Sequence, residues 1–538
     1  MRKRRRFLEA LAVGAAGVAG CLTDDQPSTT TETGTETTAT TTESVESRLA
    51  DRFDTVVDMQ DLHGIDGTAS TRIDGALQKR AGDDTVFYFP KGRYRIGSVL
   101  FEDVSNFGFV GDDATFVLDQ PGRHVYMGFR RVEDVLFRGF KADNSADNMA
   151  AWLDFKTVGG TNVIKDYTVT DFDDVEGRTH GFTLMIEGGD TSLTVENVDL
   201  SKGGNNASAA FVFRQEDFFD PKRKPGAVTF RNCLMKNWGK EGLYASPHSG
   251  PIRVLGGEYA NNAIVQVRVG SGHAPTRAIV RDVDIRVTKL HSYISDKHDL
   301  LRGIWLKEGD RALVENCRVI LRNVDPKKTP GGILVNQQFG RATIRNCHIT
   351  TDIARPGILV EDPADEYDPQ WMPSLEHLPT HWDLIFQNVT VDGRSPNTEA
   401  IRVEGRDNCR FQNLTVDVDG PNSNGVHFRN VANCHVDGGS INASRYPLLV
   451  RFAPDLTECA VHFDGMELQS TQLADSGVEL AADRDAPYCV GSKTLPDDRL
   501  DGTNTLALTN ATSETGSTVS STESTERYDL YGTWVGDM

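Results

Sequence analysis

The sequence has little lysine and no long hydrophobic run. Only 17 of its 57 basic residues are lysine, against 78 acidic residues, and its formal net charge is -21. The charge argues against nucleic-acid binding, because neutralising phosphates requires clustered Lys and Arg. No stretch of 18 apolar residues exists, so the sequence predicts no membrane-spanning helix. Abundant acid with scarce lysine is typical of a halophilic, soluble surface, which says nothing about an active site.

The first 21 residues predict an export signal. Arg4–Leu8 (RRRFL) precedes a short run of small apolar residues and resembles a twin-arginine signal, which exports folded proteins. Val18–Cys21 (VAGC) resembles a lipobox, in which Cys21 carries lipid. We therefore expect a protein that is lipid-anchored to the outer face of the cytoplasmic membrane, at the cell surface. An ordinary cleaved signal with an incidental cysteine is the alternative.

Composition then divides the rest of the chain. Residues 22–50 are rich in Thr and Glu and predict a disordered tether, since they cannot bury a core. Residues 51–495 predict the folded body. Residues 496–538 predict a low-complexity tail with a short strand at Tyr528–Val535.

One six-residue pattern recurs along the body: apolar, any, Asn/Asp/Gly, apolar, any, apolar. Its strict copies centre on Asn197, Asn232, Asn316, Asn346, Asn388 and Asn413. Its looser copies centre on Asn106, Asp134, Asp166, Gly256, Asp282, Gly438 and Gly465. Each copy is strand-like with a bend, and a period of about 25–30 residues with two or three short strands predicts a β-solenoid. Helical repeats are excluded because no 3.6-residue periodicity persists, and a propeller blade of about 40–45 residues fits worse.

Two further features keep the same period. A second short strand lies between copies and usually opens with Gly, as in Gly303–Lys307, Gly332–Asn336 and Gly357–Glu361. Cys409, Cys434 and Cys459 lie 25 residues apart. Stacked coils bring equivalent residues within about 4.8 Å, which predicts a buried ladder of thiols. Disulfides between neighbouring coils are the alternative in an exported protein.

The start of the body carries a family resemblance. His63–Gly67 precedes a short amphipathic helix near Ile73–Arg80, and Val86–Ile96 (VFYFPKGRYRI) follows. This opening resembles that of the pectate-lyase superfamily, and the resemblance covers roughly residues 55–490. It implies a right-handed parallel β-helix with a short N-terminal capping helix. It implies less about activity, because this scaffold hosts lyases, hydrolases, epimerases and non-catalytic binders.

In that family the functional cleft runs along the outside of one parallel sheet, which the Gly-opened strands resemble. Alternation then predicts which side chains face outward. These are Tyr244, Ser246, Gln266, Arg268, Trp305, Lys307, Leu334, Asn336, Leu359, Glu361, Arg402, Glu404, His427 and Arg429. Aromatic faces stack on sugars and charges meet acidic groups, so this stripe predicts a polysaccharide or glycan partner. The candidate substrate-binding residues are Tyr244, Gln266, Trp305, Asn336 and Arg402, with Trp371 from the longest insertion.

The lyase branch of the family implies an Arg or Lys base and Ca²⁺ held by carboxylates. The candidate catalytic residues are therefore Lys307, Arg268 and Glu361. The candidate Ca²⁺ ligands are Glu361, Asp362, Asp365 and Glu366. Solvated surface charge is the alternative for all of them. His248 and His273 follow outward strands and are either proton carriers or turn residues.

Two functional hypotheses remain. The first is a polysaccharide-active enzyme, lyase-like rather than a hydrolase or epimerase; hydrolysis needs paired carboxylates, and Trp305 stands where the polygalacturonase branch has Arg. The second is a non-catalytic surface protein that binds glycans or other cells. An enzyme requires two or more of Arg268, Lys307, Asn336 and Glu361 to converge on one point of the cleft.

Overall fold

The computed structural model describes residues 45–120, 123–173, 175, 180–205, 207–213, 224–292, 301–451 and 460–470, and four short strands beyond them. The predicted signal, Cys21, the tether up to residue 44 and the strand expected at Tyr528–Val535 lie outside the described residues. Residues 1–45 and 46–538 form separate units, and only the second is described below. None of the described helices is long and apolar enough to cross a membrane.

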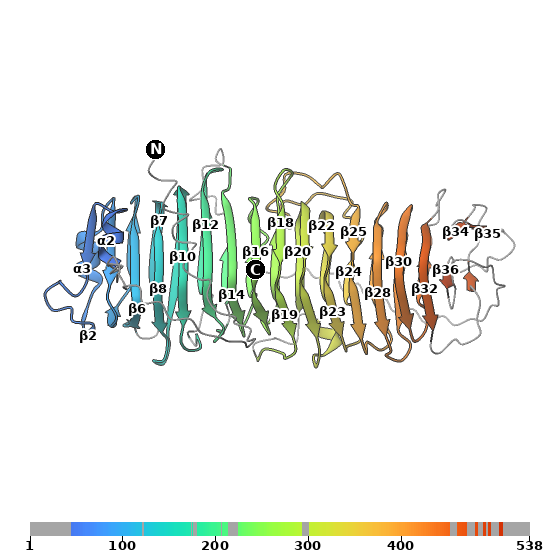
Figure 1. The fold of residues 1–538 in the computed structure, drawn as a ribbon, viewed down its shortest axis with the longest axis horizontal. Coiled ribbons are helices and arrows are strands. Elements are labelled where there is room, and N and C mark those ends of the chain that lie inside the picture. The colour runs from blue at the N-terminus through green and yellow to red at the C-terminus, as the bar shows by residue number, and fades with distance from the viewer. Residues whose placement is uncertain are drawn as a thin grey trace, which may run out of the picture. The chain divides into compact units, whose positions relative to one another are not determined.

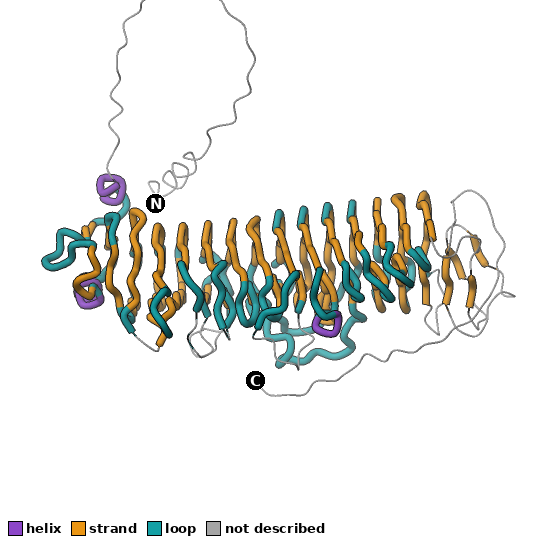
Figure 2. The backbone as a smooth tube through the Cα atoms, turned by 90° about the horizontal axis from the view of Figure 1, so that it is seen from below, coloured by secondary structure: helices purple, strands orange, loops and turns teal. Residues whose placement is uncertain are grey.

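The chain winds as a right-handed parallel β-helix of about 14 turns, which confirms the predicted fold. Figure 1 shows the turns stacked along one axis, with the N-terminal turns in blue and the later ones in orange. From β1 to β32 the strands pair in parallel with their equivalents in neighbouring turns, so the turns build three ladders. The loops that leave this regular stack are teal in Figure 2.

Ladder 1 begins with two short strands and continues through strands that are shared with the other ladders. It contains β1 (Thr55–Asp58), β3 (Thr85–Phe89), β6 (Gly108–Leu118), β8 (Leu136–Asp143), β10 (Thr161–Val169), β12 (Ser192–Leu200), β14 (Ala227–Lys236), β16 (Ile252–Ala260), β18 (Ala278–Arg281), β20 (Arg302–Glu315), β22 (Gly331–Arg345), β25 (Leu384–Gln387), β28 (Arg410–Val418), β30 (Cys434–Ala443) and β32 (Val461–Ser470).

Ladder 2 takes the second halves of the long strands of ladder 1. Its own strands are β2 (Thr68–Arg72), β4 (Arg93–Ile96), β19 (Asp284–Val287), β21 (Arg318–Leu321), β23 (His348–Thr351) and β26 (Thr390–Gly393). Ladder 3 takes the first halves of β20 and β22. Its own strands are β5 (Val99–Glu102), β7 (Arg123–Glu133), β9 (Met149–Gly159), β11 (Phe182–Ile186), β13 (Ala210–Val212), β15 (Leu243–Ala245), β17 (Val265–Gly270), β24 (Ile358–Val360), β27 (Glu399–Glu404), β29 (Asn424–Arg429) and β31 (Leu448–Arg451).

The recurring Asn/Asp/Gly marks the corner between ladders 1 and 2. Residues at this corner have positive φ, such as 52° at Asn346 and 71° at Gly256. Asn, Asp and Gly tolerate this left-handed conformation best, which explains the pattern. The side chains also connect successive turns: Asn346 Nδ2 donates to Asn316 Oδ1 at 3.2 Å, and Asn388 Nδ2 donates to Asn346 Oδ1 at 3.0 Å.

The register of the first copies was wrong. Asn106 and Asp134 lie before β6 and β8, at the corner that leads into ladder 1, and the true equivalents of Asn346 in these strands are Asp113 and Gly139. The error has a physical reason, because Asn106 and Asp134 also have positive φ, of 46° and 53°. Two corners of each turn therefore select the same residue types.

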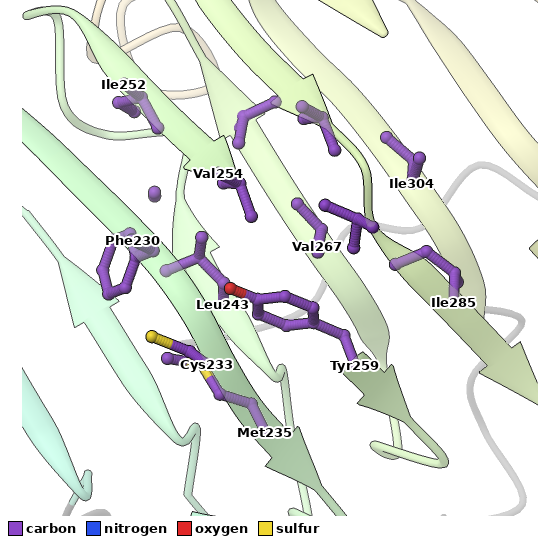
Figure 3. Packing of buried hydrophobic residues seen from close by; sticks show 14 of the residues in the cluster. Phe230, Cys233, Met235, Leu243, Ile252, Val254, Tyr259, Val267, Ile285 and Ile304 are labelled. Atoms are coloured by element: carbon purple, nitrogen blue, oxygen red, sulfur yellow. The ribbon is translucent and has the colours of Figure 1, made fainter. Parts of the chain in front are cut away.

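Inward side chains fill the space between the ladders. The early turns contain stacked rings, such as Phe116 and Phe140 with centroids 4.5 Å apart, and the later turns are mainly aliphatic. Figure 3 shows Phe230, Val254 and Tyr259 within this core. The described cysteines of the body are buried thiols, and none of them forms a disulfide. Burial of this apolar column is what holds the turns together.

The two ends of the stack differ. At the N-terminal end, α2 (Val45–Ala50) precedes the first turns, and the predicted capping helix is α3 (Asp74–Arg80), whose Leu77 is fully buried. The other short helix, the 3₁₀ turn η2 (Pro326–Lys328), lies in the middle of the chain. The last strands are β33 (Glu479–Ala481), β34 (Tyr488–Val490), β35 (Lys493–Leu495) and β36 (Thr505–Leu508). Here β36 pairs antiparallel with β31 and β33, although it falls within the segment expected to be a polar tail.

Candidate functional site

The outer face of ladder 3 carries a continuous row of side chains. Residues of this row pair in register from turn to turn because each strand lies parallel to the next. The row runs through Asp154, Thr183, Phe211, Tyr244, Arg268, Trp305, Leu334, Leu359, Arg402 and His427. The strands predicted to form a stripe therefore do so.

Arg268 lies between two aromatic rings in this row. Its guanidinium carbon is 4.1 Å from the Tyr244 ring centroid and 4.5 Å from the Trp305 ring centroid. Its Nε donates to Ser246 Oγ at 2.8 Å, and its Nη1 lies 3.8 Å from Glu241 Oε1. Cation–π contacts and these partners hold the guanidinium as a fixed positive charge, so a proton-accepting role does not suit it.

Trp305 continues the row as an apolar step. It packs with Val265 and Leu334 in a small hydrophobic cluster outside the main core. Its indole N–H is buried and has no hydrogen-bond acceptor among the described residues. A buried donor without a partner costs free energy, so this step of the row is not optimised for stability alone.

Lys307 and Glu308 form a buried ionisable pair beside this step. They are 6% and 0% exposed, and Lys307 Nζ donates to Gln338 Oε1. Burial lowers the pKa of the Lys307 ammonium to about 8, and it raises the pKa of the Glu308 carboxyl to about 7. Glu308 lies near Lys307, Arg268 and Ser374, but neither of its oxygens makes a hydrogen bond of regular geometry in the described chain. Opposed shifts of this kind are typical of functional sites.

Glu308 was missed by the sequence analysis because simple alternation turns it inward. A bulge interrupts the register of β20 with its neighbours: Leu306 pairs with Val335, but Glu308 pairs with Gln338. The bulge places Glu308 opposite Gln338, whose side-chain oxygen accepts from Lys307. The adjacent acid and base in a glycine-opened strand were the only signal in the sequence.

Asn336 and Glu361 form the next part of the site. Asn336 Nδ2 donates to Glu361 Oε2 at 2.6 Å, and the Gln337 amide donates to the same oxygen at 3.1 Å. Burial raises the pKa of Glu361, and Lys307 is close enough to influence it electrostatically. Of the four residues expected to converge, Asn336 and Glu361 are hydrogen-bonded to each other, and Glu361 and Arg268 both influence the pKa of Lys307.

Arg406 supports this region from behind and was not predicted. It is fully buried and donates to the backbone carbonyls of Asn336, Phe339 and Glu361 at 2.9, 2.7 and 2.9 Å. Burial lowers the pKa of its guanidinium to about 10. Arg406 thus satisfies the carbonyls that the irregular backbone around Asn336 and Glu361 leaves without partners.

The long insertion after β24, residues 361–383, lies over Lys307. The Trp371 carbonyl accepts from Lys307 Nζ at 3.1 Å. The His377 ring stacks on His273 with centroids 3.8 Å apart, and the Glu376 amide donates to His273 Nε2 at 3.1 Å. We call this segment the covering loop. It presents Trp371, 54% exposed, to solvent.

Several predicted site residues have other roles. Gln266 is fully buried, and its amide bonds to Asn262 and to the Arg302 carbonyl, so its predicted place at the surface is wrong. His248 is also buried, with Nε2 2.9 Å from the Gly226 carbonyl oxygen. Arg402 is held by ion pairs with Glu399 and Glu404.

The predicted Ca²⁺ ligands do not gather around one point. The Glu361 carboxylate is turned to Asn336 and the Gln337 amide. Asp362 has only Asp365 as a neighbouring carboxylate of the set. Among the described residues no group of three or more acidic, His or Cys side chains could hold a metal ion. Ca²⁺ binding by these carboxylates stays a prediction, and no step below uses it.

The strand pairing defines a parallel β-helix protein, and an ionisable cluster lies under its covering loop. No family model matches the sequence, and no curated protein matches it significantly. Among solved structures, the A-module of mannuronan C-5 epimerase AlgE4 from Azotobacter vinelandii is 14% identical, with 71% of this chain and 100% of that chain covered and a TM-score of 0.43. PfbA, a surface adhesin of Streptococcus pneumoniae, is 11% identical, with 85% and 100% covered and a TM-score of 0.35. A mannuronic acid specific family 6 lyase from human gut microbiota is 9% identical, with 76% and 86% covered and a TM-score of 0.25. Likenesses this remote carry no argument about activity.

Proposed function

We propose that this chain acts outside the cell on an acidic polysaccharide, by removing the proton beside a uronate carboxylate, with Lys307 as the base. The observation that carries this proposal is the buried pair of Lys307 and Glu308 on β20, 6% and 0% exposed and covered by the Trp371 carbonyl. Burial of this pair lowers the pKa of Lys307 and raises that of Glu308. A lysine base must be neutral, and a pKa of about 8 supplies that form near neutral pH. The export and lipid anchoring predicted from residues 1–21 belong to the same proposal.

The residues of the site suit each part of a β-elimination. Neutral Lys307 Nζ takes the C5 proton, the electron pair forms the C4–C5 double bond, and the C4–O bond breaks. Glu308 is the acid that gives a proton to the leaving oxygen, because its raised pKa of about 7 leaves a fraction of it protonated near neutral pH. The fixed charge of Arg268 stabilises the negative charge that develops at the sugar carboxylate.

The covering loop must move before a polymer reaches Lys307, since the Trp371 carbonyl and Gln338 occupy its donors. Trp371 and Tyr367, the exposed large hydrophobic residues of the described chain, both lie on this loop and offer faces for sugar rings. The same covering favours a second candidate function, a non-catalytic glycan-binding or adhesive protein in which the loop stays closed and these rings bind the glycan.

Proton removal is tested by incubation with polygalacturonate or polymannuronate in D₂O and high salt, with and without Ca²⁺. We expect an unsaturated uronate product, seen by ultraviolet absorbance; deuterium at C5 without unsaturation would indicate an epimerase. Lys307→Met should lower the rate by about 10²–10⁴-fold, as for loss of a general base. Lys165→Met is the matched control, because Lys165 pairs with Glu196 on ladder 1. Binding of the polymer with no proton exchange at any pH would reject the enzyme and leave the binding protein.

A further inference from the structure

A second charged cluster lies on the outer face of ladder 3, several turns before Lys307. Asp154 on β9 is 2% exposed and accepts hydrogen bonds from the Tyr126 hydroxyl at 2.6 Å and from Thr183 Oγ1 at 2.7 Å. Lys156 Nζ lies 3.5 Å from Asp154 Oδ2. Arg130 Nη2 donates to the Tyr126 hydroxyl at 3.0 Å, and its Nε lies 4.0 Å from the same carboxylate. One buried carboxylate therefore fixes two cations on this face.

The winding of the chain does not require these cations. Arg130, Lys156 and Met185 occupy equivalent positions in three successive turns, and Met185 shows that an apolar side chain fits there. Removing a lysine from water is unfavourable unless the charge has a purpose or a partner. Lys156 is 7% exposed and shares Asp154 with Arg130, whose side chain remains 30% exposed. Two cations share one carboxylate, and the partly exposed Arg130 carries the excess positive charge to the surface.

An aromatic surface adjoins the cations. The half-buried Trp152 ring packs against the Tyr126 ring with centroids 4.9 Å apart, and its N–H donates to Thr183 Oγ1 at 2.9 Å. A fixed indole beside an arginine and a lysine combines a stacking face with donors for an anion. Recognition of an acidic sugar unit needs these two elements.

This cluster and Lys307 share one face. Asp154 lies in the row that continues through Thr183, Phe211, Tyr244 and Arg268 to Trp305. Five steps of about 4.8 Å separate Asp154 from Trp305, or about 24 Å. The Phe211 and Tyr244 rings stack with centroids 4.7 Å apart, so aromatic surface continues between the two charged positions.

We propose that Arg130 and Lys156 form a distal subsite for a carboxylated sugar unit of the same polymer that is held at Lys307, with Trp152 as the stacking face. The identity of the ligand rests on the proposed function. A chain that spans both positions binds at two points at once, so affinity should rise with length and then reach a plateau.

The test is calorimetric titration with oligogalacturonates from dimer to dodecamer, using the Lys307→Met protein so that no ligand is consumed. We expect the longest oligomers to bind at least about tenfold more tightly than short ones, since charge-assisted contacts are among the stronger hydrogen bonds. Lys156→Met should abolish the gain with length, and Lys156→Arg should retain most of it. Lys141→Met is the control. Lys141 lies on the second half of β8, in ladder 2, where it is an exposed partner of Asp113, so this variant should show the same gain in affinity with length as the parent.

A gain with length that survives both Lys156→Met and Arg130→Gln would overturn the subsite, as would an equal gain with neutral gluco-oligosaccharides. Persistence of the gain without any proton exchange in the wild-type protein would reject Lys307 chemistry and keep the subsite. Circular dichroism and the retained binding of Lys156→Arg separate loss of the subsite from loss of the fold.

Discussion

The asparagine corner and the outer face of ladder 3 use polar side chains in opposite ways. At the corner the same residue type recurs, stays near solvent and bonds to its equivalent in the next turn, as Asn346 does with Asn316 and Asn388. On ladder 3 the residue changes at almost every step, and ionisable groups such as Lys307 and Glu308 are buried. Burying such groups opposes folding. The repeated residues therefore identify the positions that determine the fold, and the positions where the repeat is broken identify the candidate functional site.

The largest effect on stability should come from the group that supports the non-repeating region. Arg406→Met fills the space but leaves the carbonyls of Asn336, Phe339 and Glu361 without donors. Each buried acceptor without a donor costs about 1 kcal/mol or more, so we expect the free energy of unfolding to fall by at least about 3 kcal/mol. Native-state hydrogen exchange around residues 336–340 measures it. Unchanged exchange would mean that these carbonyls find other partners.

A single change at the corner should cost less. Asn346→Ala places a Cβ residue at φ 52° and removes two ladder hydrogen bonds, so we expect about 2 kcal/mol of destabilisation. Asn346→Gly removes the same bonds but suits the backbone, and should cost about half as much. Urea unfolding of the two variants separates the contribution of the backbone conformation from that of the two hydrogen bonds. Equal losses would show that backbone conformation contributes little to the choice of Asn.

This contrast also explains how much could be read from the sequence. The solenoid was predictable, because every turn requires a residue with positive φ at the corner, where Asn346 and its equivalents lie. The capping helix was predictable from the family resemblance of its segment. Glu308 was not, because a bulge in β20 overrides alternation, and Gln266 was misplaced because its amide serves Asn262 instead of the surface. Arg406 lies on a loop and contacts backbone more than 40 residues away, which no local pattern encodes.

The pH dependence of activity tests the buried pair. The profile should be bell-shaped, with its maximum between about pH 7 and pH 8: activity rises as Lys307, with a pKa of about 8, becomes neutral, and it falls as Glu308, with a pKa of about 7, loses the proton it must donate. The negative charge of Glu308 raises the pKa of Lys307, so Glu308→Gln should move this rise to lower pH, by roughly one pH unit or 1.4 kcal/mol. It should also lower the maximal rate, since the proposed acid is lost. A rise that stays at the same pH would show that another group is the base.

The smallest effect should come from the covering loop, which lies over Lys307 on ladder 3. His377→Ala removes a ring stack on His273, worth about 1 kcal/mol, so the loop should open about fivefold more often. Hydrogen exchange of the Glu376 amide, which donates to His273 Nε2, should accelerate by that factor while exchange in β20 and β22 stays constant. His348→Ala is the control, because His348 pairs with Asp392 at the surface of ladder 2. If opening limits access to Lys307, the His377 variant should bind uronate polymers faster than the parent, and a slower rate would show that the loop forms part of the binding surface and not a barrier to it.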